Sequence, residues 1–468
     1  MRRKKEPLIL QDVEIVEIGA EGNSIAKIDN KILFVPSAIP GDIVDVQIIK
    51  NKKNYFEGRI ISIKHKSKIR IEPVCAHFGL CGGCKWQHLP YEEQLKWKEK
   101  QVIENIKRIG KISSIKVNPI IPSPDVYYYR NKLEYTFSDN KWLTKQQIES
   151  PNYYKEPGAG FHVPNMFDKI IDIDKCYLQD DFSNTVRNSL KNFLIKNKLP
   201  FFDLRTKKGL IGNLIIRNTL CGEWMVIVVF GTNEEKEKQL MIMDYLKNNF
   251  PQINSLNYII NTKLNDSIND LDVFCYLGKP YIIEEIDNLK FRIGPKSFFQ
   301  TNSKQALAMY KIVRQMAHVD ENSIVYDLYT GTGTIANFVA PFVKKVIGIE
   351  YVPEAINDAN INSAFNNITN TTFIVGDVKE VINAEFINNH GHPDVVITDP
   401  PRSGMHPSVV KKIIEILPKR IVYVSCNPAT QARDLSLLSD KYIVEEMQPL
   451  DMFPHTHHIE NIVKLALK

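Results

Sequence analysis

From about residue 290 to the C-terminus, short apolar segments rich in β-branched residues alternate with segments of helical periodicity. Together with their flanking residues, the apolar segments read IVYDLYTGTGTIANFVA, KKVIGIEYVPEAINDANINSAFNN, TFIVGDV, DVVITDPP and RIVYVSC. Such alternation is typical of a parallel sheet covered by helices. The sequence therefore predicts a doubly wound, Rossmann-like α/β domain over residues 290–468, with its ligand crevice at the carboxyl ends of the strands.

The first of these strands turns into a helix through Gly331 and Gly333, and the next strand ends in Glu350. A carboxylate about twenty residues after such a turn binds the hydroxyl groups of a ribose. The full Gly-x-Gly-x-x-Gly fingerprint is missing, because Ile335 and Ala336 stand where it would continue. A nucleoside cofactor without a pyrophosphate, such as S-adenosylmethionine, fits this pattern better than a dinucleotide.

Two further strand ends carry acidic residues. Asp377 follows TFIVG, where a carboxylate can meet an adenine amino group, and Asp399 follows DVVIT at the mouth of the crevice. Each aspartate alone is also a common helix cap or turn residue. Polar residues at four successive strand ends favour a ligand site over that alternative.

Cys426 follows the last of these segments and is expected at the rim of the same crevice. An ionised cysteine is a strong nucleophile. Carbon 5 of uracil needs such a group, because thiolate addition to carbon 6 makes carbon 5 able to attack a methyl donor. A base must then remove the carbon 5 proton, and the stretch LDMFPHTHHIE supplies Glu460.

The stretches DPPRSG, YVSCNPAT and DMFPHTHHIE resemble the signature sequences of the RNA 5-methyluridine methyltransferases, and FRIGPKSFFQTN resembles the segment preceding their methyl-donor fold. The similarity extends over nearly the whole chain. It implies that Cys426 is the nucleophile and Glu460 the base. It also implies S-adenosylmethionine contacts for Gln300, Tyr329, Glu350, Asp377 and Asp399. Thr330 departs from the family, many members of which carry a cysteine there, but no loss is expected because that position is not catalytic.

Three histidines precede Glu460 and lie near Asp451 in the sequence, at positions 455, 457 and 458. They are candidate metal ligands, yet there is no helical His-x-x-x-His and no second cluster. A role in shaping the RNA pocket or tuning the base is the favoured interpretation.

Three of the seven cysteines, Cys75, Cys81 and Cys84, are grouped as Cys-x5-Cys-Gly-Gly-Cys, and Cys176 is the expected fourth partner. Four thiolates bind either zinc or an iron–sulfur cluster. Structural zinc sites usually come as two Cys-x-x-Cys pairs, so three grouped ligands plus one remote ligand favour a 4Fe-4S cluster. Subgroups of the resembled family carry this pattern, and four protein ligands imply a closed, structural cluster. The remaining Cys221 and Cys275 are expected in the core.

Residues 1–68 alternate apolar and polar residues between turn signals, which predicts a small OB-like barrel resembling the TRAM module. Lys52, Tyr55 and Phe56 are candidate RNA contacts there, or else an edge strand and its turn. Residues 69–289 are expected to form a central α+β domain that holds the four-cysteine cluster. In this domain YYYRNKLEYTF offers Arg130 and Lys132 to RNA, or else forms a strand with a charged outer face.

Within the resembled family, the N-terminal barrel together with the cysteine cluster implies 23S ribosomal RNA as the substrate, because the bacterial transfer-RNA members are shorter and usually lack both; transfer RNA is the alternative. The formal charge of +6 is compatible with nucleic acid. No segment approaches the roughly 20 apolar residues of a membrane span, and the N-terminus lacks a signal peptide, so we expect a cytoplasmic monomer. A non-catalytic ribosome-assembly factor would lack Cys426 or Glu460, and a redox enzyme would need an exposed or open cluster.

Overall fold

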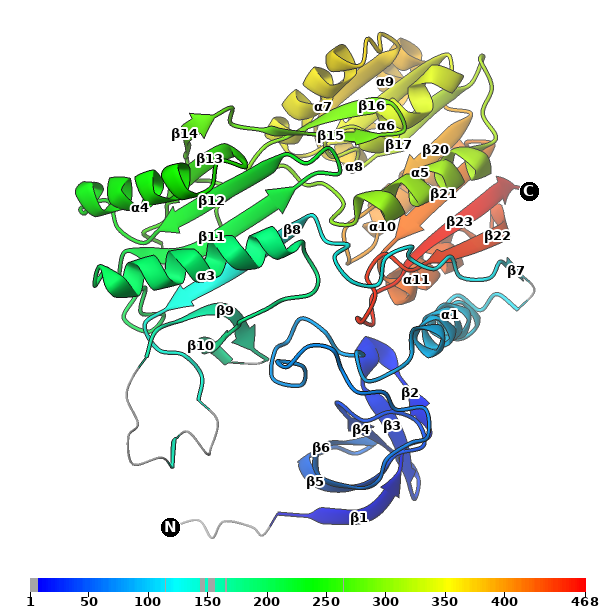
Figure 1. The fold of residues 1–468 in the computed structure, drawn as a ribbon. Helices are drawn as coiled ribbons and strands as arrows, with labels where there is room; N and C mark the ends of the chain where they lie inside the picture. The colour runs from blue at the N-terminus through cyan, green and yellow to red at the C-terminus, as the bar shows by residue number, and fades with distance from the viewer. Residues whose placement is uncertain (1–6, 114, 144–147, 150–155, 165, 264) are drawn as a thin grey trace.

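The computed structural model describes the chain except residues 1–6, 114, 144–147, 150–155, 165 and 264. Figure 1 shows three larger sheets, with the N-terminal sheet below a central and a C-terminal sheet. Among the described residues, no helix is long and apolar enough to cross a membrane.

The C-terminal sheet has eight strands in the order β19-β18-β17-β20-β21-β23-β22-β7. The first five strands in this order are parallel to their neighbours, β23 runs antiparallel to both β21 and β22, and β7 is parallel to β22. The strands are β7 (Lys116–Val117), β17 (Ile324–Leu328), β18 (Lys345–Glu350), β19 (Thr371–Val375), β20 (Val395–Thr398), β21 (Arg420–Ser425), β22 (Tyr442–Leu450) and β23 (Glu460–Leu467).

Helices cover both faces of this sheet because alternate strand residues point to opposite sides. Val325 and Val422 face a core shared with α5 (Ser303–Ala317) and α6 (Thr334–Val339). Tyr326 and Tyr423 face a second core. That core also contains residues of α1 (Tyr91–Arg108), α8 (Val378–Val381), α9 (Ala384–His390), α10 (Pro407–Ile416) and α11 (Pro428–Leu438). The expected α/β architecture is confirmed, but the sheet is mixed rather than wholly parallel because β23 is antiparallel to both of its neighbours. Helix α7 (Pro353–Phe365) follows β18.

The central sheet has seven strands in the order β10-β9-β8-β11-β12-β13-β14. They are β8 (Lys132–Ser138), β9 (Gly158–Val163), β10 (Met166–Asp172), β11 (Ile211–Asn218), β12 (Trp224–Phe230), β13 (Ile253–Ile260) and β14 (Val273–Gly278). One face packs against α3 (Asp181–Lys196) and α4 (Lys236–Asn249). Ile215 and Ile227 on the other face join the core of the C-terminal sheet. The central and C-terminal sheets are therefore packed together, and the hairpin of β15 (Ile282–Ile286) and β16 (Leu289–Ile293) connects them.

Helix α1 shows how tertiary packing departs from sequence order. Its Val102 and Ile106 are buried in the core of the C-terminal sheet, and β7 extends that sheet. The stretch from α1 to β7 thus packs on the C-terminal sheet, although it lies in the sequence between the N-terminal and central sheets. Figure 1 shows α1 beside α11.

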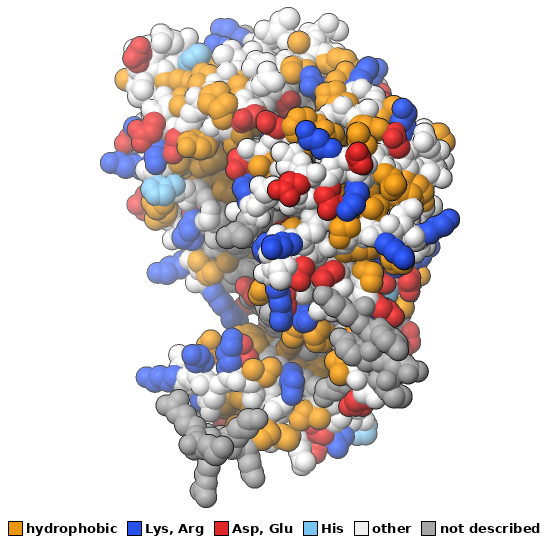
Figure 2. All heavy atoms as spheres, turned by 90° about the vertical axis from the view of Figure 1, so that its left-hand side faces the viewer, with side chains coloured by type: hydrophobic (Ala, Val, Ile, Leu, Met, Phe, Trp, Pro, Cys, Tyr) orange, Lys and Arg blue, Asp and Glu red, His pale blue; other side chains and the backbone are white. Residues whose placement is uncertain are grey.

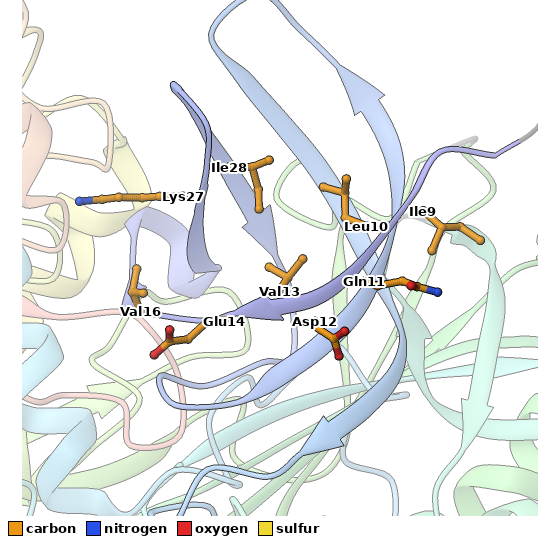
Figure 3. A pocket seen from close by; sticks show the side chains of 9 residues that line it. All are labelled: Ile9, Leu10, Gln11, Asp12, Val13, Glu14, Val16, Lys27 and Ile28. Carbon is orange, nitrogen blue, oxygen red and sulfur yellow. The ribbon is translucent and has the colours of Figure 1, made fainter.

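The N-terminal sheet has the order β1-β5-β6-β4-β3-β2 and encloses its own small core, which includes Leu33, Val44 and Val46. Its strands are β1 (Ile9–Glu14), β2 (Glu17–Ile18), β3 (Ser24–Ile28), β4 (Lys31–Val35), β5 (Ile43–Asn51) and β6 (Tyr55–His65). A surface hollow beside β1 is lined by side chains between Ile9 and Ile28 (Figure 3). The residues that line it include none of the predicted site residues.

Candidate active site

Cys426 lies between the end of β21, at Ser425, and the start of α11, at Pro428. Asn427 fixes this junction. Its side-chain oxygen accepts from Ala429 N at 3.1 Å, and its side-chain nitrogen donates to Arg402 O at 3.0 Å. The thiol is therefore held at the carboxyl end of a parallel strand, as the sequence predicts, and it is half-buried.

Four carboxyl groups stand at the same edge of the sheet as this thiol. In spatial order the row is Glu350 ending β18, Asp327 in β17, Asp399 after β20, Cys426 after β21 and Glu460 starting β23. Because β23 is antiparallel to β21, its first residue meets the strand end that carries Cys426. The sheet thus brings together the nucleophile and base that the sequence predicts.

The groups in this row raise one another's pKa. Burial, with Glu350 nearby, raises the pKa of Asp327 to about 7, and burial together with Asp327 raises the pKa of Asp399 to about 7. Burial and then Asp399 raise the pKa of Glu460 well above its ordinary value. Burial and then Glu460 raise the pKa of Cys426 to about 11. A buried carboxylate with a raised pKa is suited to accept a proton.

Arg402 supplies a positive charge that the sequence did not reveal. Its guanidinium lowers the pKa of both Cys426 and Glu460, against the larger effect of burial. Arg402 Nη2 lies 2.7 Å from His458 Nδ1, and its carbonyl accepts from Thr430 Oγ1 at 3.2 Å. The DPPRSG loop is thereby tied to α11 just beyond the thiol.

The loop before Glu460 is supported by α1. Lys98 Nζ donates to Asp451 Oδ1 at 2.6 Å, with both side chains fully buried, and Tyr91 donates to the other carboxylate oxygen at 2.8 Å. Gln94 accepts from His455 N at 2.8 Å. The Asp451 carboxylate thus forms an ion pair with Lys98. The sequence did not reveal this pair because the two residues are far apart along the chain.

The three histidines of this loop have pKa values lowered by burial, to about 4, about 3 and about 4 for His455, His457 and His458. They are therefore neutral near pH 7. The ring of His455 stacks on Tyr127, with 4.5 Å between the ring centres. Within the described part of the chain, no three His, Cys, Asp or Glu side chains are arranged to hold a metal ion.

The predicted cofactor residues surround the glycine turn after β17. Glu350 accepts hydrogen bonds from Gly331 N at 3.2 Å and Val352 N at 3.0 Å, which orient its carboxylate. Gly331 has φ +55°, and a Cβ built on it would meet no protein atom within 4 Å. Open space beside an oriented carboxylate at this strand end fits the ribose of a nucleoside cofactor.

Tyr329 and Asp377 lie close to each other beside this turn. Burial is the main cause that raises the pKa of Tyr329 to about 12, and the charge of Asp377 is the second. Asp377 also caps α8, accepting from Lys379 N at 3.2 Å, and forms an ion pair with Lys379 Nζ at 3.2 Å. The capping role that the sequence left open is therefore present in the structure.

Gln300 lies in the loop between β16 and α5. Asn131 Nδ2 donates to Gln300 O at 2.9 Å, and Thr332 Oγ1 donates to Phe298 O at 3.4 Å, so this loop lies against the glycine turn. The Phe298 side chain is 69% exposed there. An exposed aromatic ring beside the crevice was not identified from the sequence, although the FFQ motif contains it.

The thiols of the predicted cluster, Cys75, Cys81, Cys84 and Cys176, lie near enough to influence one another's pKa, but among the described residues no three of them are arranged to hold a metal ion. Burial and then the thiols of Cys176 and Cys75 raise the pKa of Cys81 to about 11, and the pKa of Cys84 is raised to about 12 by burial and the other thiols. Directly after Cys84, two successive backbone amides donate to His455 O at 2.8 and 3.0 Å. The cysteine loop is thus fastened to the loop that carries Glu460.

Cys221 and Cys275 correct an expectation. Both are exposed rather than buried in the core. Cys221 lies in the turn between β11 and β12, and Cys275 lies on β14 at the edge of the central sheet, where side chains are only partly covered.

Comparison with known proteins agrees with this geometry. The profile of the family "tRNA (Uracil-5-)-methyltransferase" matches residues 219–468, and that of the TRAM domain matches residues 10–61. An RNA methyltransferase described as uncharacterized, from Bacteroides thetaiotaomicron, is 52% identical over 96% of this chain and 100% of its own. A second, from Chlorobaculum tepidum, is 37% identical over 90% of this chain and 89% of its own.

A solved structure is also similar over the full length. The tRNA (uracil-54, C5)-methyltransferase of Pyrococcus abyssi, in complex with S-adenosyl-L-homocysteine, has a TM-score of 0.75 and 29% identity, covering 98% of this chain and 100% of its own. The chain therefore belongs to the family of S-adenosylmethionine-dependent RNA uracil-5-methyltransferases that carry a TRAM domain.

Proposed function

We propose that this enzyme methylates carbon 5 of a specific uridine in 23S ribosomal RNA, with Cys426 as the nucleophile and Glu460 as the base. One observation carries this proposal: the antiparallel pairing of β23 with β21 brings the start of one strand to the end of the other, where these residues stand. In this mechanism the Cys426 thiolate bonds to carbon 6 of the uracil, and carbon 5 gains nucleophilic character. S-adenosylmethionine, when bound, supplies the electrophilic methyl group.

The remaining steps fall to residues of the chain. Glu460 takes the proton from carbon 5, the electron pair of that C–H bond re-forms the carbon 5–carbon 6 double bond, and the sulfur of Cys426 leaves carbon 6. Arg402 favours the ionised thiol because its charge lies near the sulfur. The exposed ring of Phe298 offers a surface for stacking the unpaired target base.

The methyl donor is held, in this proposal, by Gln300, Tyr329, Glu350, Asp377 and Asp399. Support comes from the two backbone amides that orient Glu350 and from the open space at Gly331.

The test of the catalytic assignment is a covalent adduct. Glu460→Gln should allow thiol addition and methyl transfer but block removal of the carbon 5 proton, so the enzyme stays attached to RNA and migrates slowly on a denaturing gel. Cys426→Ala combined with Glu460→Gln is the matched control and should give no adduct. Free enzyme alone with Glu460→Gln would count against Glu460 as the base.

We further propose that Cys75, Cys81, Cys84 and Cys176 hold a 4Fe-4S cluster. In a 4Fe-4S cluster each thiolate binds a different iron. The four sulfur atoms therefore stand farther apart than the ligands of a single metal ion. The mutual effects of the four thiols on their pKa values support the proximity of these sulfur atoms. Anaerobically purified protein should be brown and contain about four irons per chain; colourless, zinc-loaded protein would contradict the cluster.

The substrate RNA is proposed from the TRAM domain together with the cysteine group. Figure 2 shows lysine and arginine side chains gathered along the notch above the N-terminal part of the molecule, which suits a polyanion. Transfer RNA is the second candidate, because the full-length structural relative acts on tRNA. Mapping 5-methyluridine in ribosomal and transfer RNA from a strain lacking the protein distinguishes the two.

We also infer that the chain works as three units with divisions near residues 68 and 289. Their separate sheets support these divisions, while the packing of α1 and β7 on the C-terminal sheet links the second unit to the third.

A further inference from the structure

Two cations face each other on the central sheet, outside the catalytic row. Lys132 on β8 and Arg217 on β11 are directly opposed in the antiparallel register, so their side chains emerge on the same face. On this face Ile215 and Ile227 enter the core shared with the C-terminal sheet. The Arg217 side chain is almost completely buried, at 5% exposure, and Lys132 is partly buried.

The partners of this cation pair do not neutralise it. Arg217 Nη2 donates to the Ser297 carbonyl at 2.7 Å, whereas its Nε is buried without a hydrogen-bond partner. In the described part of the chain, neither Lys132 nor Arg217 forms an ion pair with a carboxylate. Glu134, two residues along β8, accepts from Asn213 Nδ2 at 3.3 Å, and its charge raises the pKa of Lys132 against the larger effects of burial and of Arg217.

Such an arrangement lowers the stability of the unliganded protein. Like charges at directly opposed strand positions repel each other, and a buried charge without a counter-ion costs free energy. Burial, reinforced by Arg217, lowers the pKa of Lys132 to about 8, and burial lowers the pKa of Arg217 to about 10. Both groups remain largely charged near pH 7, so a bound anion would reduce the repulsion between them.

The pair lies next to the loop that carries Gln300. Asn131, the neighbour of Lys132, donates two hydrogen bonds to this loop: its N donates to Thr301 O at 2.8 Å and its side chain to Gln300 O at 2.9 Å. Ser297, which receives the Arg217 bond, also donates to Asp358 of α7 at 2.6 Å. An anion at Lys132 would therefore lie near the loop that carries Phe298 and Gln300.

We propose that Lys132 and Arg217 form an oxyanion site that binds a backbone phosphate of the substrate RNA next to the target uridine. Lys132 contacts the phosphate directly, and the buried guanidinium of Arg217 behind it adds to the positive electrostatic potential at the phosphate. This inference rests on the proposed function, since it takes RNA as the substrate. The methyl donor also carries a carboxylate into this crevice. The experiment distinguishes binding of that carboxylate from binding of an RNA phosphate.

The test compares full-length Lys132→Met with the unsubstituted protein. The ligands are unmodified 23S ribosomal RNA and transfer RNA from a strain lacking the enzyme, and S-adenosylhomocysteine. We expect RNA affinity to fall about tenfold at moderate salt, and the slope of log affinity against log salt concentration to become shallower by about one contact, roughly 0.7 to 0.9. The affinity for S-adenosylhomocysteine should stay unchanged, and the Tm of the free protein should rise, because the repulsion is removed.

Two variants serve as controls. Lys132→Arg keeps the charge and should restore the salt slope. Lys247→Met removes a lysine from α4, on the opposite face of the same sheet, and should leave RNA affinity, salt slope and Tm near those of the unsubstituted protein. These variants separate a local contact from a general change in net charge.

Each outcome decides between the possibilities. Weaker S-adenosylhomocysteine binding with an unchanged salt slope would assign the site to the methyl donor and overturn the phosphate proposal. Unchanged affinity for both ligands, or a lower Tm, would show the pair to be structural. The proposed function itself fails if the unsubstituted protein binds neither RNA and Glu460→Gln forms no adduct. Only this inference fails if the unsubstituted protein binds RNA and Lys132→Met binds it equally well.

Discussion

Two regions of this molecule are built around cysteine, and they differ in what surrounds the sulfur. Cys426 stands alone at a strand end, beside carboxyl groups and one guanidinium. The neighbouring titratable groups that raise the pKa of Cys81 and Cys84 are other cysteine thiols, and both residues pack against the core of the central sheet. Burial raises the pKa in both regions, so burial does not distinguish them. The difference lies in the neighbours: a carboxyl group and a cation near Cys426 fit its proposed role as a nucleophile, whereas neighbouring thiols fit the proposed role of Cys81 and Cys84 as ligands.

The two regions are also in contact. The backbone amides that follow Cys84 bond to the carbonyl of His455, in the loop that leads to Glu460. The same loop is held from the other side by Lys98. A structural change around Cys84 can therefore shift the loop before Glu460 through these backbone hydrogen bonds.

The largest expected effect separates the two kinds of cysteine. Cys426→Ala should reduce methyl transfer by on the order of 10⁴-fold or more, because no other group can add to carbon 6. RNA binding should remain within about twofold in a filter-binding assay. Cys275→Ala, which removes an exposed thiol, is the control and should keep full activity. Appreciable turnover by Cys426→Ala would contradict its role as the nucleophile.

A change in the proposed cluster should act differently. Cys176→Ser should abolish the visible absorbance, reduce bound iron and lower the Tm, because a structural cluster contributes folding free energy. Methyl transfer should fall less than with Cys426→Ala, since no reacting atom is removed. Unchanged iron content and absorbance would exclude Cys176 as a ligand; Cys221→Ser is the matched control.

The buried ion pair that supports the shared loop can be broken separately. Lys98→Met leaves the Asp451 carboxylate buried and without its cation, which should reduce the free energy of unfolding by about 3–5 kcal/mol in urea titrations. Lys98→Met combined with Asp451→Asn should recover part of that loss. Lys96→Met on the exposed face of the same helix should change stability by about 0.5 kcal/mol at most. A loss for Lys98→Met no larger than this would show that the pair is not important for stability.

The smallest expected effect concerns the cation beside the nucleophile. Alkylation of Cys426 should become faster as pH rises, about tenfold per unit below the thiol pKa of about 11, because only the thiolate reacts. Arg402→Met should raise that pKa further and slow alkylation about three- to tenfold at pH 8. Mass spectrometry of the peptide containing Cys426 measures this rate. Arg402→Lys, which keeps the charge, should lie between the two, and an unchanged rate in Arg402→Met would exclude the effect.

Much of the fold could be predicted because its signals are local. The alternation of strands and helices after residue 290 and the strand ends at Glu350, Asp399 and Cys426 depend on residues close together in sequence. The buried face of α1 was less accessible to prediction. Its Gln94 and Lys98 are polar residues that became buried because the catalytic loop supplies partners for them.

The sequence by itself determined the family, the α/β architecture of the C-terminal part, and the identity of the residues at the strand ends. Periodicity and short motifs carry that information, since they follow from the geometry of single strands and helices. Only the tertiary structure decided that Arg402 stands beside Cys426, that Lys98 pairs with Asp451 across 353 residues of chain, and that Lys132 faces Arg217. The physical reason is that charge interactions depend on distance in space, which is set by how distant strands pair and pack rather than by sequence order.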